Sequence, residues 1–180
     1  MEELIKREYP FRGRILSLRL DHVRLPNGNI TTREIAEHPG AVAIVALDAE
    51  GRVVLVRQYR HAVGRDLLEI PAGTLEKDEP PEKTAPRELK EETGLSAQRW
   101  ELLERFYASP GVLTEEMYVY LARDLAEGVS EPMGDEDLQV ERIPLNDALE
   151  LVARGEIADA KSIIGLLLAE KKVANESTSP

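Results

Sequence analysis

The stretch RELKEETGL, residues 87 to 95, places three carboxylates close together in the chain. If the stretch is helical, Glu88, Glu91 and Glu92 lie three or four residues apart and share one face of the helix. Like charges at this spacing destabilise an isolated helix by roughly 0.2–0.5 kcal/mol per pair. A hard divalent cation prefers carboxylate and carbonyl oxygens, so a bound metal turns this repulsion into attraction. The pattern therefore predicts a helix with a metal-binding face, and the alternative is an acidic face that water solvates.

The residues around the three glutamates fit the same helix. Arg87 precedes Glu91 by four residues and can pair with it on the helix surface. Gly94 suits the left-handed conformation that often ends a helix. Gly73 permits a tight backbone that a ligand can approach closely. These positions fit a helix that ends at Gly94 and a carboxylate that Arg87 holds in place.

Pro86 limits where this helix can begin. A proline inside a helix removes one hydrogen bond and clashes with the preceding turn. The helix therefore either begins near Thr84, with Pro86 in its first turn, or continues through a break at Pro86. Residues 88 to 92 follow the proline in both cases, so the predicted site does not depend on the choice.

Composition narrows the classes of protein. The chain has 180 residues, 42% of them hydrophobic, which suits one domain or one domain with a small appendage. It has no cysteine, so disulfides and thiolate metal sites are excluded. The net charge of −11 disfavours nucleic acid as a partner. No apolar run is long enough to span a membrane and the first residues lack a signal-peptide pattern, so we expect a cytoplasmic protein.

Hydrophobic periodicity divides the chain at about residue 40. The first forty residues read as an antiparallel β-ribbon, with strands over 14–25 and 30–38, which should pack on the main domain or on a second subunit. A compact mixture of strands and helices follows, and residues 173–180 read as a flexible tail. The predicted strands are 41–47, 52–59, 66–73, 100–108, 116–125 and 139–145, and the predicted helices are 80–93, 145–154 and 159–172.

The segment from residue 73 to residue 95 resembles the signature box of the Nudix hydrolases at every fixed position. The matching residues are Gly73, Glu79, Arg87, Glu88, Leu89, Glu91, Glu92, Gly94 and Leu95. The resemblance implies an α/β (α+β) Nudix fold, a mixed β-sheet sandwiched between helices, with an N-terminal antiparallel β-ribbon or sheet. It also implies an enzyme that cleaves a nucleoside diphosphate linked to another group, and a non-catalytic module of the same fold is the alternative.

Flanking segments resemble one subfamily, the ADP-ribose pyrophosphatases. Pro110 lies sixteen residues beyond Gly94, and the segments 57–60 and 68–73 look like those of this subfamily. The resemblance implies Mg²⁺-dependent hydrolysis of ADP-ribose to AMP and ribose 5-phosphate, with Mn²⁺ or another divalent cation as an alternative. It further implies a homodimer in which residues 1–40 form the dimerisation region and residues 41–172 the Nudix hydrolase domain.

The resemblance also implies roles for single residues near the metal. Glu88, Glu92 and the backbone carbonyl of Ala72 would hold the metal, with Glu91 close by. A glutamate on a later loop serves as the base in this subfamily. Glu136, in the segment 132–137, is the matching carboxylate and a further metal ligand, and Glu91 is the alternative base. An ordinary acidic surface loop is the competing interpretation of that segment.

Other residues would contact the substrate. Arg60 matches the arginine that contacts the diphosphate, and a guanidinium fork suits phosphate oxygens. Arg57 is a weaker candidate, and Pro110 belongs to the same substrate-binding set. Glu34 matches a glutamate that contacts adenine across the dimer interface. Thr32 stands where relatives often carry arginine, and Arg33 is its possible substitute.

Three other functions remain open. Another nucleoside diphosphate sugar, such as GDP-mannose, is an alternative substrate, because Thr32 leaves the choice of base undecided. A hydrolase of nucleoside triphosphates is a further alternative, although such enzymes commonly lack the N-terminal ribbon. A module that senses ADP-ribose without cleaving it is the alternative from a different class.

Overall fold

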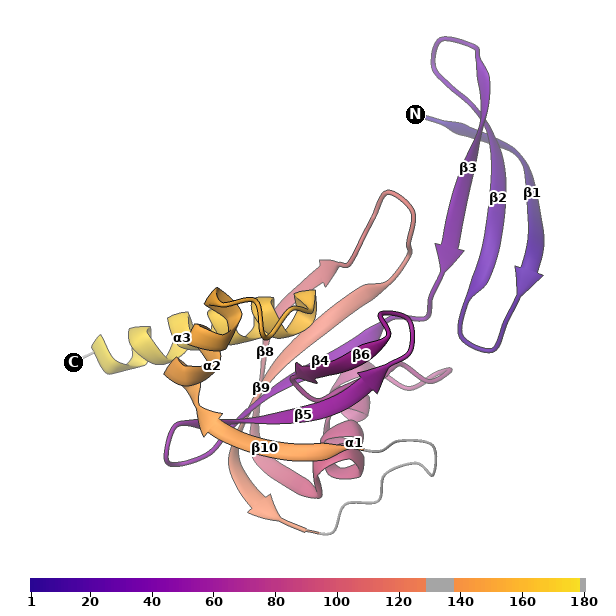
Figure 1. Ribbon diagram of the computed structural model, residues 1–180. Helices are drawn as coiled ribbons and strands as arrows, with labels where there is room; N and C mark the ends of the chain where they lie inside the picture. Colours follow the sequence, from indigo (N-terminus) through magenta and orange to yellow (C-terminus); the bar gives the residue numbers. More distant parts are fainter. Residues whose placement is uncertain (129–137, 179–180) are drawn as a thin grey trace. The chain divides into compact units, whose positions relative to one another are not determined.

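The protein is described here by a computed structural model that covers residues 1–128 and 138–178 (Figure 1). The chain divides into two compact units. The first unit comprises residues 1–40 and 106–116, and the second comprises residues 41–105 and 117–180.

The first unit is built on a three-stranded antiparallel sheet in the order β1-β2-β3. The strands are β1 (Glu3–Arg12), β2 (Ser17–Arg24) and β3 (Ile30–Glu37). The prediction of a two-stranded ribbon is therefore wrong, because it missed β1. Strand β1 has no clean alternation of buried and exposed residues, and its pairing with β2 is irregular at two places, which explains why periodicity did not reveal it.

The segment 106–116 belongs to the first unit and is hydrogen-bonded to β3. The N–H of Ala36 donates to the carbonyl of Val112 at 2.8 Å, and the N–H of Thr114 donates to the carbonyl of Ala36 at 3.0 Å. This segment contains Pro110, which the sequence pattern assigned to the larger, C-terminal region. The first unit thus joins two parts of the chain that are far apart in sequence.

The second unit contains a seven-stranded mixed sheet. Its main order is β10-β5-β4-β9-β8, with β6 paired to β5 and β7 paired to β4. Strands β4 and β9 run parallel, whereas β4 pairs antiparallel with β5 and β7. The strands are β4 (Ala41–Leu47), β5 (Arg52–Arg60), β6 (Arg65–Glu69), β7 (Ala72–Thr74), β8 (Leu95–Tyr107), β9 (Glu116–Glu127) and β10 (Gln139–Pro144).

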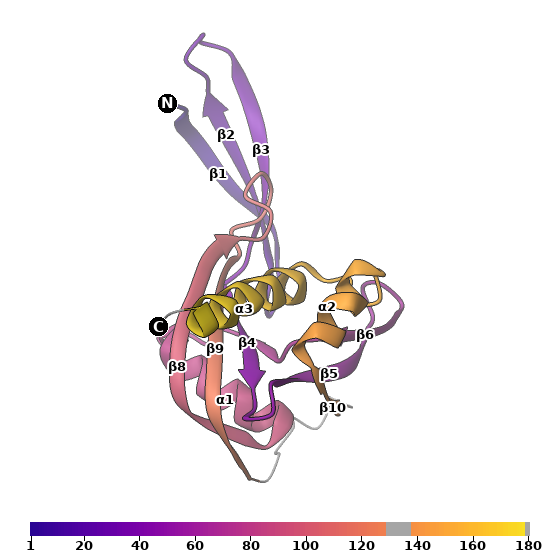
Figure 2. The same ribbon diagram turned by 90° about the vertical axis from the view of Figure 1, so that its left-hand side faces the viewer.

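Helices cover both faces of this sheet. Helix α1 (Pro81–Thr93) lies on one face, and α2 (Leu145–Ala153) and α3 (Ala160–Thr178) lie on the other (Figures 1 and 2). Every residue of β4 is buried, as expected for a strand with helices on both sides. The predicted architecture, a mixed sheet between helices with an N-terminal antiparallel sheet, is confirmed.

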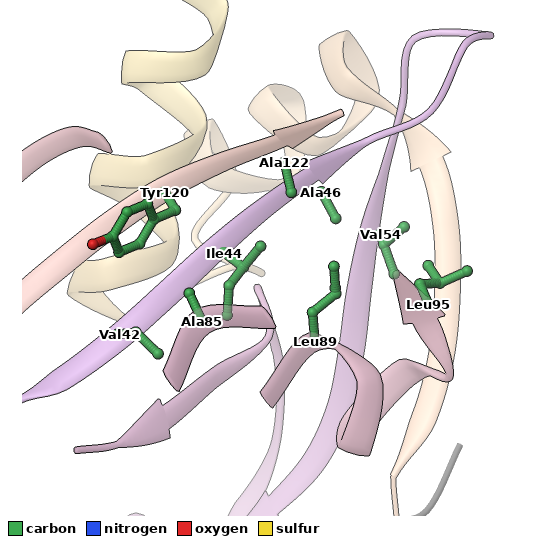
Figure 3. Close-up of a cluster of buried hydrophobic side chains, with 9 residues drawn as sticks. All are labelled: Val42, Ile44, Ala46, Val54, Ala85, Leu89, Leu95, Tyr120 and Ala122. Carbon is green, nitrogen blue, oxygen red and sulfur yellow. The ribbon is translucent and has the colours of Figure 1, made fainter. Parts of the chain in front are cut away.

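Apolar side chains join α1 to the sheet. Ala85 and Leu89 of α1 point at the sheet, and both are fully buried (Figure 3). The remaining members of this core cluster are Val42, Ile44, Ala46, Val54, Leu95, Tyr120 and Ala122. On the other face, a Cβ added to Gly165 of α3 would lie 2.9–3.3 Å from Ile70, Val45 and Val119. This close approach places α3 directly against the sheet.

The ends of two helices test the sequence pattern. Helix α1 begins at Pro81 and contains Pro86, so the helix that continues through the proline is the correct alternative. Gly94 ends it with φ 72°, which confirms the predicted left-handed end.

Helix α3 runs to Thr178, so its predicted end near residue 172 is wrong. Two ion pairs connect the last part of α3 to the sheet. Lys172 pairs with Glu101 of β8, and Glu176 pairs with Arg123 of β9. Within the described residues, no helix is long and apolar enough to cross a membrane.

Candidate active site

Two of the three glutamates on the predicted metal-binding face of α1 are buried. Glu88 is 7% exposed and Glu92 is 5% exposed, whereas Glu91 is partly exposed. Glu88 and Glu92 are four residues apart and therefore share the face of α1 that packs on the protein. Burying a carboxylate costs free energy unless charges or hydrogen bonds compensate. The position of these two side chains excludes an ordinary solvated acidic face.

The segment from Ile70 to Gly73 lies against these carboxylates. The predicted strand 66–73 is broken here into β6 and β7, because Pro71 has no N–H for a strand ladder. The N–H of Ala72 donates to Glu92 Oε2 at 3.1 Å. A Cβ added to Gly73 would lie 1.9 Å from Cδ of Glu88, so any larger residue would displace the carboxylate of Glu88. The backbone at Ala72 and Gly73 thus forms one wall of the site.

Arg87 links the acidic face to the loop before α1. Its Nη1 lies 2.9 Å from Glu91 Oε2, which confirms the predicted pair, and 2.8 Å from Glu88 Oε1. Its Nη2 lies 2.9 Å from Glu79 Oε2, and the hydroxyl of Thr84 donates to the same oxygen at 3.0 Å. The bonds to Glu79 are the main reason that the pKa of Arg87 is raised. The sequence pattern included Glu79 but did not reveal that it anchors Arg87.

The donor set at this wall suits a hard divalent cation. Glu88 and Glu92 offer carboxylate oxygens, and Ala72 offers a backbone carbonyl, the ligand types that Mg²⁺ prefers. Among residues 1–128 and 138–178, however, no three His, Cys, Asp or Glu side chains are grouped closely enough to hold a metal. The carboxylate of Glu91 is engaged by Arg87 instead. The metal ligands, Glu91 included, therefore stay a prediction.

Glu136, the predicted base and additional ligand, lies outside the residues that the structure describes. The whole segment 132–137 that contains it shares this status. Its role stays a prediction from the resemblance.

Another buried carboxylate, that of Glu69, adjoins the site. Glu69 ends β6, is 1% exposed, and directly precedes the segment that contacts Glu88 and Glu92. Arg60 forms a two-pronged pair with it, with Nε 2.9 Å from Oε1 and Nη2 2.6 Å from Oε2. Lys161, in the first turn of α3, places Nζ 2.5 Å from Oε2. Burial alone would raise the pKa of Glu69, but the bonds from Arg60 and Lys161 outweigh it and lower this pKa.

Arg60 of β5 has a raised pKa. The bond to Glu69 is the largest cause of its raised pKa, and the charge of Glu92 contributes as well, so Arg60 is electrostatically coupled to the acidic face. Sequence reasoning identified Arg60 but missed Glu69 and Lys161. The signal for Glu69 was a charged residue inside an otherwise apolar strand end, two residues before Pro71.

Arg57 does not take part in the contacts between Arg60, Glu69 and Lys161. Side chains alternate along a strand, so Arg57 and Arg60 of β5 point to opposite faces. Arg57 Nε lies 2.8 Å from Glu141 Oε1 on the neighbouring strand β10. The structure therefore does not bring the two predicted arginines together.

The first unit holds a cavity of about 370 Å³ that brings together two other predicted residues, Arg33 and Pro110. Arg33 also pairs with Glu2, with Nη2 2.5 Å from Oε1. Thr32 and Glu34 are exposed and alternate with Arg33 along β3, so they point to the opposite face. The remaining lining residues are Glu2, Arg19, Ile35, Gly111, Val112, Leu113 and Thr114.

Comparison with known families identifies the class. The family model described as the NUDIX domain matches residues 37–164, and the chain belongs to this family. A second model, the nucleoside diphosphate sugar hydrolase N-terminal domain, matches residues 2–36. A solved structure described as an ADP compounds hydrolase has a TM-score of 0.87 at 23% identity and covers 99% of this chain and 97% of its own. This likeness confirms the Nudix fold.

Curated relatives are similar over most of the chain. An ADP-ribose pyrophosphatase of Bacillus subtilis (strain 168) is 43% identical, over 96% of this chain and 95% of its own. A protein named methanol dehydrogenase activator, from Bacillus methanolicus, is 42% identical over 92% of this chain and 90% of its own. An ADP-ribose pyrophosphatase of Mycobacterium tuberculosis (strain ATCC 25618 / H37Rv) is 46% identical over 92% of this chain and 81% of its own.

Proposed function

We propose that this chain hydrolyses the pyrophosphate bond of ADP-ribose and releases AMP and ribose 5-phosphate, with a divalent metal ion as cofactor. The observation that carries the proposal is the pair of buried carboxylates, Glu88 and Glu92, held against Ala72 and Gly73. The names of the two relatives called ADP-ribose pyrophosphatase support the choice of substrate.

The proposed mechanism assigns each group one task. Glu88, Glu92 and the Ala72 carbonyl would hold Mg²⁺, or Mn²⁺ in its place. A bound cation of this kind neutralises charge on the diphosphate and activates water. Arg87 keeps the acidic face aligned through its bonds to Glu79, Glu88 and Glu91. The guanidinium fork of Arg60 would bind diphosphate oxygens in two places.

The attacking water needs a base, and two glutamates are candidates. Glu91 would have to leave its 2.9 Å pair with Arg87 before it could accept a proton. We therefore keep Glu136 as the first candidate and Glu91 as the alternative. Glu136→Gln with turnover unchanged would transfer the role to Glu91.

A substrate panel tests the proposal. The purified protein is incubated with ADP-ribose, GDP-mannose and nucleoside triphosphates, with Mg²⁺ or Mn²⁺ titrated, and products are separated by chromatography. We expect ADP-ribose to be cleaved fastest, to AMP and ribose 5-phosphate. Faster cleavage of GDP-mannose would select the other nucleoside diphosphate sugar, and binding of ADP-ribose without cleavage would select the sensing module.

We also propose that the protein is a homodimer formed through residues 1–40. Several large apolar side chains of this region are exposed, which supports an interface there. These side chains are Leu4, Ile5, Phe11, Ile15, Leu16, Leu18 and Ile30. In this arrangement Glu34, Thr32 or Arg33 would contact the adenine from the partner subunit. A cytoplasmic location, consistent with the absence of cysteine, is a further proposal that cell fractionation would test.

A further inference from the structure

Two cations share one oxygen of the buried carboxylate of Glu69. Arg60 Nη2 and Lys161 Nζ lie 2.6 and 2.5 Å from Oε2, so these nitrogens are at most 5.1 Å apart, the sum of the two distances. One carboxylate cannot neutralise two cations. Lys161 also lies 2.9 Å from Asp159 Oδ2, which compensates part of its charge. Glu69 would therefore keep a cationic partner if Arg60 turned away.

Two hydrogen bonds hold the first turn of α3, which carries Lys161, beside the segment that follows Glu69. Asp159 Oδ2 accepts a hydrogen bond from the N–H of Ser162 at 3.1 Å, a typical cap at the start of a helix. The buried hydroxyl oxygen of Ser162 accepts from the N–H of Ile70 at 2.9 Å. Ile70 follows Glu69 in the chain and precedes the wall at Ala72 and Gly73. The first turn of α3 is thus bonded to the same segment that contacts Glu88 and Glu92.

We propose that Lys161 is a positioning residue that lets Arg60 exchange partners when a diphosphate binds. Arg60 turns from Glu69 to the diphosphate oxygens, and Lys161 stays on Glu69 and keeps that carboxylate neutralised. Without Lys161, the departure of Arg60 would leave a buried carboxylate with no cation, a change that is strongly unfavourable in general. Arg60 would then stay on Glu69, and the diphosphate would bind weakly. This inference rests on the proposed function, because it requires a diphosphate substrate.

The central variant is Lys161→Met, which keeps the length of the side chain and removes its charge. We expect KM for ADP-ribose to rise by about tenfold, equivalent to 1.4 kcal/mol of binding, while kcat changes less than about twofold. Lys161→Arg keeps the charge and should restore KM to within about threefold of the wild type. The matched control is Lys172→Met, because Lys172 makes a similar 2.5 Å pair with Glu101 on the exposed surface. The control should leave both constants unchanged.

A second substitution separates this mechanism from a simple loss of positive charge. Glu69→Gln removes the charge that retains Arg60, so Lys161→Met/Glu69→Gln should bind better than Lys161→Met alone. If Lys161 instead made only a general electrostatic contribution, Lys161→Met would weaken binding by the same factor with and without Glu69→Gln. Thermal unfolding of each variant reports whether the fold is kept. If Lys161 had a purely structural role, Lys161→Met would lower the unfolding temperature, and the double variant would not recover binding.

Binding is measured without turnover by calorimetry with the α,β-methylene analogue of ADP-ribose, which cannot be cleaved, and with inorganic pyrophosphate. We expect the Kd of Lys161→Met to rise about tenfold and the double variant to recover most of this loss. Equal affinity of the wild type and Lys161→Met, or a double variant no better than the single one, would overturn the inference alone. A wild type that binds neither probe and cleaves no ADP-ribose would overturn the proposed function as well.

Discussion

At the scale of single residues, Glu92 shows how a costly position is compensated. Its carboxylate is 5% exposed, and the N–H of Ala72 bonds to one oxygen. Arg60 adds a positive charge nearby, since Glu92 contributes to the raised pKa of that arginine. Such an arrangement of buried charge is typical of functional sites, because a structural position alone would favour an apolar residue.

We predict that Glu92→Gln abolishes most of the hydrolysis of ADP-ribose and keeps the fold. Glutamine has nearly the same shape, but its amide cannot supply the charged ligand. We expect kcat to fall by roughly 10²–10³-fold, the size typical for losing one group that stabilises charge in the transition state. Steady-state kinetics at saturating Mg²⁺ measures the effect, with circular dichroism to verify the fold.

The matched control is Glu82→Gln on the exposed first turn of the same helix. It should retain normal turnover. If Glu92→Gln also hydrolyses ADP-ribose at the normal rate, the assignment of Glu92 to the metal is wrong.

Glu69 gives a prediction for the pH dependence of stability. Its pKa is lowered in the folded protein, although burial opposes this shift, so the unfolded chain takes up a proton more readily. The contribution of Glu69 to the free energy of unfolding is therefore present above the ordinary glutamate pKa, about 4.3, and lost as pH falls below it. Urea unfolding at a series of pH values from 7 to 3 measures this loss.

Glu69→Gln has no charge at this position and should show a flatter dependence of stability on pH over the same range. Identical slopes for the variant and the wild type would show that Glu69 is not the group responsible.

At the scale of elements, two glycines are expected to respond differently to substitution. Gly73 faces the carboxylate of Glu88, and a Cβ there would lie 1.9 Å from its Cδ. Gly155, which follows α2, has φ 74° and no neighbour within 4 Å of an added Cβ. The first position is limited by close contact and the second by backbone conformation.

We predict that Gly73→Ala displaces Glu88 and lowers kcat by at least about tenfold. Gly155→Ala should instead leave kcat unchanged and lower the free energy of unfolding by about 1 kcal/mol, because alanine disfavours positive φ. Kinetics and urea unfolding of both variants compare the two effects. Normal turnover of Gly73→Ala would mean that Glu88 is not held in its functional position by this wall.

Elements also show what the sequence could predict. The end of α1 at Gly94 and the pair of Arg87 with Glu91 depend on residues at most four apart, and both predictions are confirmed. Glu69 and Lys161 are ninety-two residues apart, so no local spacing reveals their contact. Strand β1 was missed for a related reason, because its pairing with β2, rather than its own pattern, makes it a strand.

At the scale of the whole molecule, two compact units carry different parts of the proposed function. The second unit contains the buried carboxylates of Glu69, Glu88 and Glu92, together with Arg60 and Arg87. The first unit contains Arg33 and Pro110 at one cavity and a sheet with exposed apolar side chains. Such apolar surface in a small unit is typical of an interface with another protein.

We predict a homodimer with a mass near 40 kDa, twice the 20.1 kDa of the chain, by light scattering after gel filtration. Phe11 and Leu18 are register partners on neighbouring strands, and both are exposed. Phe11→Asp/Leu18→Asp should shift the protein to monomer, since charge disfavours burial at an apolar interface.

The matched control is Leu167→Asp, which changes an exposed leucine of α3 in the second unit. It should leave the mass unchanged. A wild-type mass of 20 kDa at micromolar concentration would contradict the proposed dimer and the contribution of its N-terminal region to adenine binding.

The most direct measurement is a crystal structure of the protein with Mg²⁺ and the α,β-methylene analogue of ADP-ribose. We expect metal density about 2.1 Å from carboxylate oxygens of Glu88 and Glu92 and from the carbonyl of Ala72, in contact with the bridging phosphates. Carboxylates of Glu88 and Glu92 without metal, together with an analogue bound at another surface, would contradict the proposed function.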